Sequence, residues 1–213
     1  MAEKASSLQQ QMVPAGRGVL RFVSAASLFD GHDAAINMIR RLLQASGAEV
    51  VHLGHNRSVS DIVRAAIQED ADGIAVSSYQ GGHNEYFKYM VDMLKEQGCE
   101  HIRVVVGGGG TIAPDEIEML EQYGVEKIYT PEDGRRMGLI PMIEDVIKRV
   151  RAARKPHYEF GPLHVRDHRR IATSITVLEG ADGEGEAAQE SNQIRRALGR
   201  VKHQAPVLGI TGT

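Results

Sequence analysis

Hydrophobic positions along the chain form two kinds of segment, short apolar runs and longer stretches with helical spacing. The apolar runs are as long as strands and predict five of them, at residues 19–24, 48–53, 73–78, 102–107 and 125–129. These runs do not alternate strictly between apolar and polar residues. Such continuous runs are typical of strands that are covered on both faces of a sheet.

Between the strands, apolar residues recur with the period of a helix. In the clearest case five of them occupy positions i, i+3, i+4, i+7 and i+8: Val59, Ile62, Val63, Ala66 and Ile67. Four similar stretches predict further helices around residues 36–43, 87–94, 114–124 and 140–150. Five strands alternating with five helices predict the α/β class, with a five-stranded, doubly wound parallel sheet of the flavodoxin or Rossmann type.

The same pattern predicts how the chain is divided. Residues 1–17 are polar and are expected to be a disordered leader, whereas residues 18–150 contain the α/β domain. Residues 151–205 are expected to be a linker with short helices. Residues 206–213 (PVLGITGT) predict the start of another strand.

Composition narrows the possible partners and location. The chain has 213 residues and a formal net charge of −3, which argues against a nucleic-acid partner. Its apolar runs are shorter than the roughly 18 residues of a transmembrane helix, and its N-terminus lacks the apolar core of a signal peptide. Its one cysteine, Cys99, excludes an internal disulfide. We therefore expect a cytoplasmic protein without a nucleic-acid or membrane partner.

Candidate chemistry lies where the predicted strands end, because ligands of such sheets bind outside the carboxyl ends of the strands. Asp30, Gly31 and His32 follow the first strand. Imidazole is a common ligand for transition metals, and a neighbouring carboxylate can fix its tautomer. One histidine and one aspartate do not make an ordinary metal site. Metal binding at His32 therefore requires a cofactor that supplies most of the coordination itself.

Two further motifs follow the third and fourth strands. The third strand ends in Ser77, Ser78 and Tyr79, whose hydroxyls suit either a ligand or the cap of the next helix. The fourth ends in the glycine run 107–110, which allows close approach of a bulky ligand. A phosphate-binding loop is not favoured, because the run continues as Thr-Ile-Ala-Pro-Asp rather than Lys-Ser or Lys-Thr.

The three motifs, DGHDAA, SSY and GG, occur in an order and at spacings that resemble the cobalamin-binding domain family over about residues 18–150. The family pattern is Asp-x-His-x-x-Gly, then Ser-x-Leu, then Gly-Gly. The resemblance implies that His32 replaces the dimethylbenzimidazole of the cofactor as lower cobalt ligand and that Asp30 bonds the far nitrogen of His32. The displaced nucleotide tail would enter the sheet beside Ser77 and the glycines. Ala35 and Tyr79 depart from the pattern, which has glycine and leucine there.

The resemblance therefore gives a set of expected site residues. His32 is the expected metal ligand, and no catalytic residue is expected in this chain. The expected cofactor-binding residues are Asp30, Gly31, His32, Asp33, Ser77, Tyr79, Gln80, Gly81, Gly107, Gly108, Gly109 and Thr130.

Longer segments are similar to the N-terminal domain of the fused isobutyryl-CoA mutases: ASLFDGHDAAINMIRR, LGHNRSVSDIV, SSYQGGHNEYFKYM and YTPEDGRRMGL. That family implies adenosylcobalamin, radical isomerisation of an acyl-CoA, and homodimerisation of the full-length protein. It also implies two partner domains in the same chain, a GTPase that binds GTP and Mg²⁺ and a barrel that binds acyl-CoA. Residues 206–213 resemble the strand entering a P-loop, so the chain is expected to be an N-terminal piece that binds cofactor but does not turn over alone.

Two other classes were considered. A cobalamin carrier domain of a methyltransferase has a similar fold but usually follows a helical cap domain, whereas about 17 polar residues precede the first strand here. A signalling receiver requires an aspartate after the third strand and a lysine after the fifth. The chain has Ser77 and the segment TPEDG at these places, which excludes the receiver.

Overall fold

The computed structural model describes residues 19–31, 33–108, 110–154, 161, 163–164, 166–179 and 186–199. Five strands form one sheet: β1 (Arg21–Ala26), β2 (Glu49–His52), β3 (Gly73–Ser77), β4 (Arg103–Gly107) and β5 (Lys127–Ile128). Their order is β2-β1-β3-β4-β5, and every neighbouring pair is parallel. The predicted doubly wound parallel sheet is thus confirmed. The order in which strands are added to the sheet reverses between β1 and β3, and such a switch point is where sheets of this type bind ligands.

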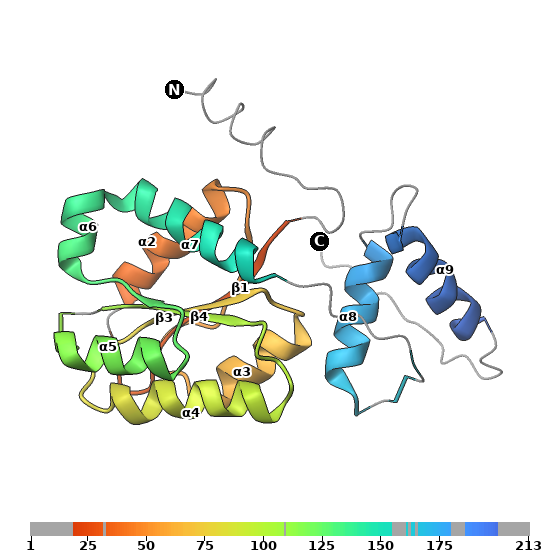
Figure 1. Cartoon of the computed structure of the whole chain (residues 1–213), viewed down its shortest axis with the longest axis horizontal. Helices are drawn as coiled ribbons and strands as arrows, with labels where there is room; N and C mark the ends of the chain where they lie inside the picture. Colours follow the sequence, from red (N-terminus) through yellow and green to blue (C-terminus); the bar gives the residue numbers. More distant parts are fainter. Residues whose placement is uncertain are drawn as a thin grey trace, which may run out of the picture.

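Helices cover both faces of this sheet (Figure 1). One face lies under α2 (Asp33–Ala45) and α7 (Leu139–Ala153), and the short helix α6 (Pro131–Met137) contacts α7. The opposite face lies under α3 (Val59–Gln68), α4 (His83–Glu96) and α5 (Pro114–Tyr123).

The prediction of five helices between the strands was wrong. In the described part of residues 18–150 there are six, and the additional one is α6. The segment PEDGRRM has no apolar periodicity, so the hydrophobic pattern does not reveal it. Its start is instead encoded by a cap. The Thr130 hydroxyl accepts a hydrogen bond from the Asp133 N–H at 3.1 Å, and the Asp133 carboxylate accepts one from the Thr130 N–H at 3.0 Å. Pro131 occupies the first turn, where its missing N–H costs little.

Two separate groups of apolar side chains form the core, one on each face of the sheet. Ile74 of β3 and Val104 of β4 point toward α3, α4 and α5. The alternate residues Ala75 and Val105 point toward α2 and α7. This alternation is the period-two geometry of a strand, and it explains why the strands lack polar positions.

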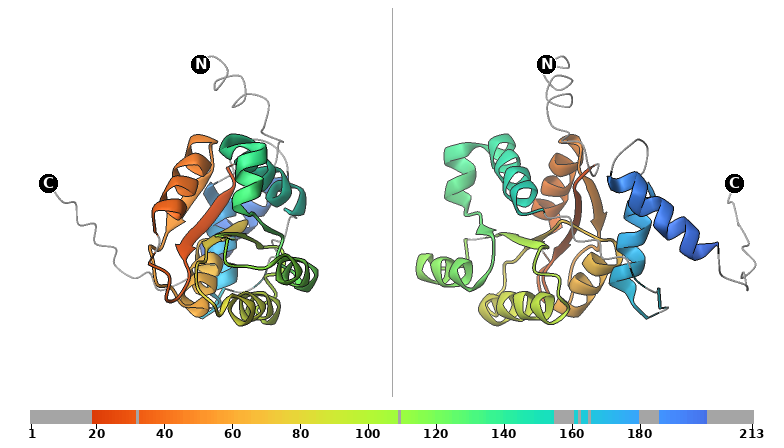
Figure 2. Two further views of the ribbon diagram at one scale, coloured as in Figure 1. Left: turned by 90° about the vertical axis from the view of Figure 1, so that its left-hand side faces the viewer. Right: turned by 45° about the vertical axis from the view of Figure 1, so that its right-hand side comes forward.

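The described residues after α7 contain two more helices, α8 (His168–Glu179) and α9 (Glu186–Leu198). Figure 2 shows them beside one end of the sheet, where α8 packs against α3 and α9 packs against α8. The side chain of Arg169 donates to the carbonyl of Gly98 at 2.7 Å, which fastens α8 to the loop after α4. Helices are thus present in the predicted linker, while the predicted segments 1–17 and 206–213 lie outside the described residues. Over the part of the chain that the structure describes, no helix has the length and apolarity needed to span a membrane.

Candidate functional site

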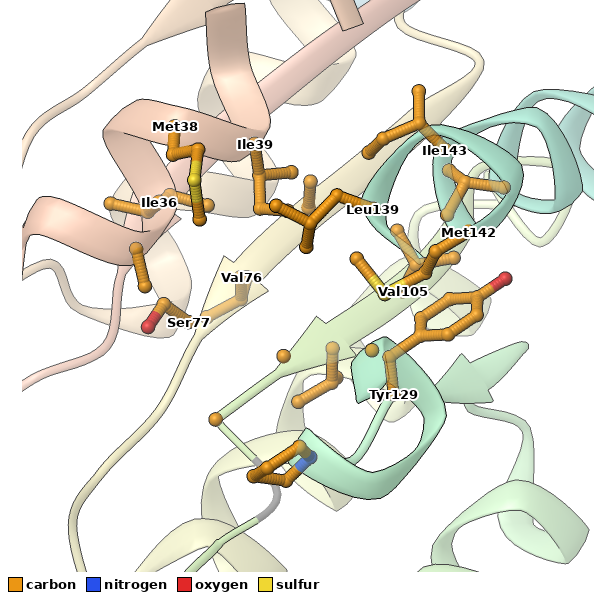
Figure 3. Close-up of a pocket in the computed structure, with 18 of the residues that line it drawn as sticks. Ile36, Met38, Ile39, Val76, Ser77, Val105, Tyr129, Leu139, Met142 and Ile143 are labelled. Atoms are coloured by element: carbon orange, nitrogen blue, oxygen red, sulfur yellow. The ribbon is translucent and has the colours of Figure 1, made fainter. Parts of the chain in front are cut away.

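A cavity of about 350 Å³ lies between α2, α7 and the carboxyl ends of β3 and β4. Figure 3 shows its walls, with Ile36, Met38 and Ile39 from α2 facing Leu139, Met142 and Ile143 from α7. The ring of Tyr129 closes another side. The cavity is mostly apolar, and its volume is within the range of roughly 300–1,000 Å³ that is common for ligand pockets.

Small residues on the sheet leave room for this cavity. Ala75 and Ser77 of β3 lie beside Val105 and Gly107 of β4 in the parallel register. A Cβ atom added at Gly107 would meet no heavy atom within 4 Å, so this glycine keeps space open. Gly108 has a different reason to be glycine. Its φ is +91°, and a Cβ there would collide with the carbonyl oxygen of Ser78.

The hydroxyl of Ser77 is the polar feature of the cavity that points to a ligand. Ser77 lines the cavity and is 3% exposed. Its Oγ has no hydrogen-bond partner among the described residues. Because a buried polar atom is costly to leave unsatisfied, the Ser77 hydroxyl in the wall of this cavity is available for a hydrogen bond to a ligand.

The loops after β1 and β3 are tied together beside the cavity. Asp30 is 2% exposed, and its Oδ2 accepts a hydrogen bond from the Tyr79 N–H at 2.9 Å. The Ser27 N–H donates to the Ser77 carbonyl at 2.9 Å, and the Ser78 N–H donates to the Gly107 carbonyl at 3.1 Å. The carboxyl ends of β1, β3 and β4 are therefore held in fixed relation, with the buried carboxylate of Asp30 two residues before residue 32.

The structure brings five of the predicted site residues together around the cavity: Ser77, Tyr79, Gly107, Gly108 and Thr130. Asp30 and Gly31 lie on the neighbouring loop, and Asp33 begins α2. His32, the predicted cobalt ligand, and Gly109 lie outside the described residues.

Gln80 and Gly81 are in the loop between β3 and α4 and are not among the cavity-lining residues. The Gln80 side chain accepts a hydrogen bond from the Gly82 N–H, so it organises its own turn. The Thr130 hydroxyl caps α6 as well as lining the cavity. These contacts assign a local structural role to Gln80 and Thr130 but do not test whether they bind a ligand.

The apolar walls are the part of the site that motif analysis missed. Ile36, Ile39 and Ile143 belong to the apolar repeats of the helices predicted around residues 36–43 and 140–150. Such periodicity shows which face of a helix is buried but not whether the space beside it is filled. Tyr129 was also missed, and its hydroxyl donates to Asp145 Oδ2 at 2.7 Å. Burial and this carboxylate both raise the pKa of Tyr129, so its ring remains a neutral wall of the cavity.

A cluster of titratable side chains near the β3–α4 loop joins two helices instead of lining the cavity. His83 is buried, with Nδ1 3.0 Å from the Gln80 carbonyl and Nε2 3.0 Å from Glu116 Oε2. The backbone N–H of Ala113 donates to Glu116 and, with His83 and Asn84, holds the pKa of that carboxyl below its ordinary value. Within the described ranges, no group of three or more His, Cys, Asp or Glu residues is arranged to hold a metal ion.

Comparison with known proteins gives three kinds of relative. The chain is 53% identical over 203 residues to the fused isobutyryl-CoA mutase of Cupriavidus metallidurans. The matched segment covers 93% of this chain but only 18% of that protein. It is 32% identical over 125 residues to the pivalyl-CoA mutase small subunit of Xanthobacter autotrophicus, covering 58% of this chain and 82% of that subunit. A solved structure, a cobalamin-binding protein from Desulfitobacterium hafniense, superposes with a TM-score of 0.51 at 21% identity over 61% of this chain and 58% of that one, which shows a shared fold.

The family assignment follows from the first half of the chain. The model of the B12 binding domain matches residues 20–133, which include β1 to β5 and the cavity-lining residues up to Pro131. The small subunit from Xanthobacter autotrophicus is matched over most of its own length. This chain belongs to the B12-binding domain family.

Proposed function

We propose that this chain binds adenosylcobalamin with its nucleotide tail displaced from cobalt and with His32 as the lower ligand. The observation that supports this most is the apolar cavity that ends at a buried, unsatisfied Ser77 hydroxyl. It lies beside the loop that leads through Asp30 and Gly31 to His32.

The residues around the cavity fit a flat aromatic base on a polar tail. Apolar side chains of α2 and α7 favour burial of the dimethylbenzimidazole rings. The Ser77 hydroxyl can bond a ring nitrogen or a ribose oxygen, and Gly107 lets the ligand approach the backbone. A corrin ring holds cobalt through four nitrogens of its own, so a single protein imidazole is sufficient.

Asp30 is assigned the role of orienting His32. A metal-bound imidazole usually donates its second N–H to a carboxylate or carbonyl, which fixes the tautomer and raises the basicity of the ligand. Asp30 is two residues before His32, is 2% exposed, and is held by the Tyr79 N–H. When bound, the cofactor supplies radical chemistry through homolysis of its cobalt–carbon bond.

The wider role proposed here is that of a cofactor module. The chain spans only 18% of the fused isobutyryl-CoA mutase that it resembles at 53% identity. In the whole protein, interconversion of isobutyryl-CoA and n-butyryl-CoA would need further domains that bind acyl-CoA, GTP and Mg²⁺. We place such a protein in the cytoplasm and expect it to form a homodimer. This chain would hold the lower face of the cofactor and would contribute no group that touches the acyl-CoA.

The test is a titration of the 213-residue chain with adenosylcobalamin, followed by visible absorption. Wild-type protein should bind stoichiometrically and give the spectrum of tail-displaced, histidine-ligated cobalt. His32→Ala should lose that ligation. Asp30→Ala should weaken affinity by about 10- to 100-fold, as is usual for a group that orients a metal ligand.

A second histidine variant makes the assignment specific. His55 is exposed and follows β2 at the same edge of the sheet. His55→Ala should leave the spectrum unchanged. If His55→Ala abolished histidine ligation and His32→Ala preserved it, the ligand would be wrongly assigned. The absence of any spectral change with wild-type protein would contradict the proposed function itself.

A further inference from the structure

Arg135 gives the cavity a charge that its other walls lack. Among the described residues that line the cavity, Arg135 alone carries a formal charge. Its side chain is 73% exposed. The hydrocarbon stem therefore forms part of the wall while the guanidinium remains in contact with solvent, as is common for arginine beside apolar surface. This combination places a cation at the mouth of an otherwise apolar pocket.

The present partner of Arg135 is weakly held. Arg135 Nη2 donates to Glu132 Oε2 at 2.7 Å, one turn earlier in α6, and both side chains are 73% exposed. Exposed pairs of this kind contribute little to stability, because solvent screens them and two long side chains must be ordered. An anion arriving at the mouth can therefore replace Glu132 at little cost.

We propose that Arg135 binds the phosphodiester of the nucleotide tail of cobalamin at the mouth of this cavity. The inference rests on the proposed function and adds a recognition residue to it. The tail carries one negative charge, on the phosphate that joins its ribose to the corrin side chain. If the base occupies the apolar interior, the phosphate stays nearer the opening. A guanidinium at that opening matches phosphate in both charge and hydrogen-bond geometry.

The next residue of the chain provides a matched control. Arg136 is 72% exposed and donates to Asp133 Oδ1 at 3.1 Å, so it resembles Arg135 in charge, exposure and type of pair. It differs in not being among the cavity-lining residues. Arg135→Gln and Arg136→Gln remove the same charge from the same short helix. A difference between them therefore reports position at the cavity and not net charge or helix stability.

The experiment measures dissociation constants of two ligands, adenosylcobalamin and adenosylcobinamide, which lacks the nucleotide and its phosphodiester. Arg135→Gln should weaken adenosylcobalamin binding by about 3- to 10-fold, the size expected for a partly exposed charge pair. It should leave adenosylcobinamide binding unchanged. Arg136→Gln should change neither. The loss in Arg135→Gln should shrink as ionic strength rises to about 1 M, where the screening length is only about 3 Å.

A variant of the competing carboxylate tests the same contact from the other side. Glu132→Gln frees Arg135 from its pair and should strengthen adenosylcobalamin binding by about 2-fold. Equal effects of Arg135→Gln and Arg136→Gln on adenosylcobalamin would overturn the assignment, and so would an equal loss with both ligands. These results differ from failure of the proposed function, in which wild-type protein would not bind adenosylcobalamin at all.

Discussion

The two faces of this sheet are built from the same strands but differ in how completely they are filled. Toward α3, α4 and α5, Ile74 and Val104 pack into a continuous core. Toward α2 and α7, their neighbours Ala75, Ser77 and Gly107 are small and leave a cavity of about 350 Å³. One face therefore stabilises the fold, and the other combines stability with space for a ligand.

Substitutions that add a large side chain should show the largest difference between the two faces of the sheet. Gly107→Leu places a side chain where a Cβ meets nothing within 4 Å, so it should raise the dissociation constant for adenosylcobalamin by roughly 100-fold, or about 2.7 kcal/mol, without loss of stability. Ala25→Leu adds three carbons to the filled face and should lower the free energy of unfolding by about 1–3 kcal/mol. Titration and chemical denaturation measure the two effects. Similar destabilisation by both variants would contradict the difference between the faces.

Substitutions that remove side-chain volume should destabilise the protein to different extents at the two adjacent valines of β4. Val104 faces the filled side and Val105 faces the cavity, and they are 2% and 4% exposed. Val104→Ala should cost roughly 2–3 kcal/mol, because it removes buried methyl groups and creates a void. Val105→Ala should cost about 1 kcal/mol, since a side chain at the edge of a void has fewer contacts to lose. Urea denaturation of both variants provides the comparison, and equal losses would show that the cavity is closed in solution.

Hydrophobic pattern and turn residues were sufficient to predict most of the sheet. Gly47, Gly98 and Gly124 end or follow helices and have positive φ, as their positions after apolar repeats indicate. The N-terminal cap at Ser58 was also predictable, and its hydroxyl accepts the Asp61 N–H at 3.2 Å. Helix α6 was missed because its only strong signal is the cap formed by Thr130 and Asp133.

The cavity was not predictable from periodicity, although the sequence carries a signal for it. Every second residue of β3 from Gly73 to Ser77 is small, while the residues between them are Ile74 and Val76. Such an asymmetry distinguishes a crowded face from an open one, but only after the strand register is known. The motifs around Ser77 and Gly107 therefore lie at the cavity, as the strand-end rule predicts, while its walls become visible only from the packing of α2 against α7.

Alanine substitutions at the two adjacent serines of this region should have smaller effects on stability, and these effects should be opposite in sign. Ser77 Oγ has no partner within the described structure, whereas Ser78 Oγ accepts a hydrogen bond from Ser27 Oγ at 3.0 Å. Ser77→Ala should be neutral or stabilising by up to about 1 kcal/mol and should weaken adenosylcobalamin binding, because the hydroxyl is satisfied only by ligand. Ser78→Ala should destabilise by about 1 kcal/mol, because it leaves Ser27 unsatisfied. Loss of stability in Ser77→Ala would mean that its hydroxyl is already bonded in the free protein.

The smallest expected effect is a pH dependence confined to the filled side. Glu116 joins α5 to α4 through His83 and Asn84, and the Ala113 N–H is the main reason that its pKa lies below the ordinary value of 4.5. A carboxyl with a lowered pKa in the folded state stabilises the protein above its unfolded pKa, and this contribution disappears as the pH falls through the folded pKa. The free energy of unfolding should therefore decrease below about pH 4.5, and Glu116→Gln should make that decrease less steep. Denaturation at several pH values measures the slope, and an unchanged slope would remove Glu116 from the acid response. The cavity should be insensitive to this substitution, because Glu116 is not among its lining residues, so adenosylcobalamin affinity at neutral pH serves as the internal control.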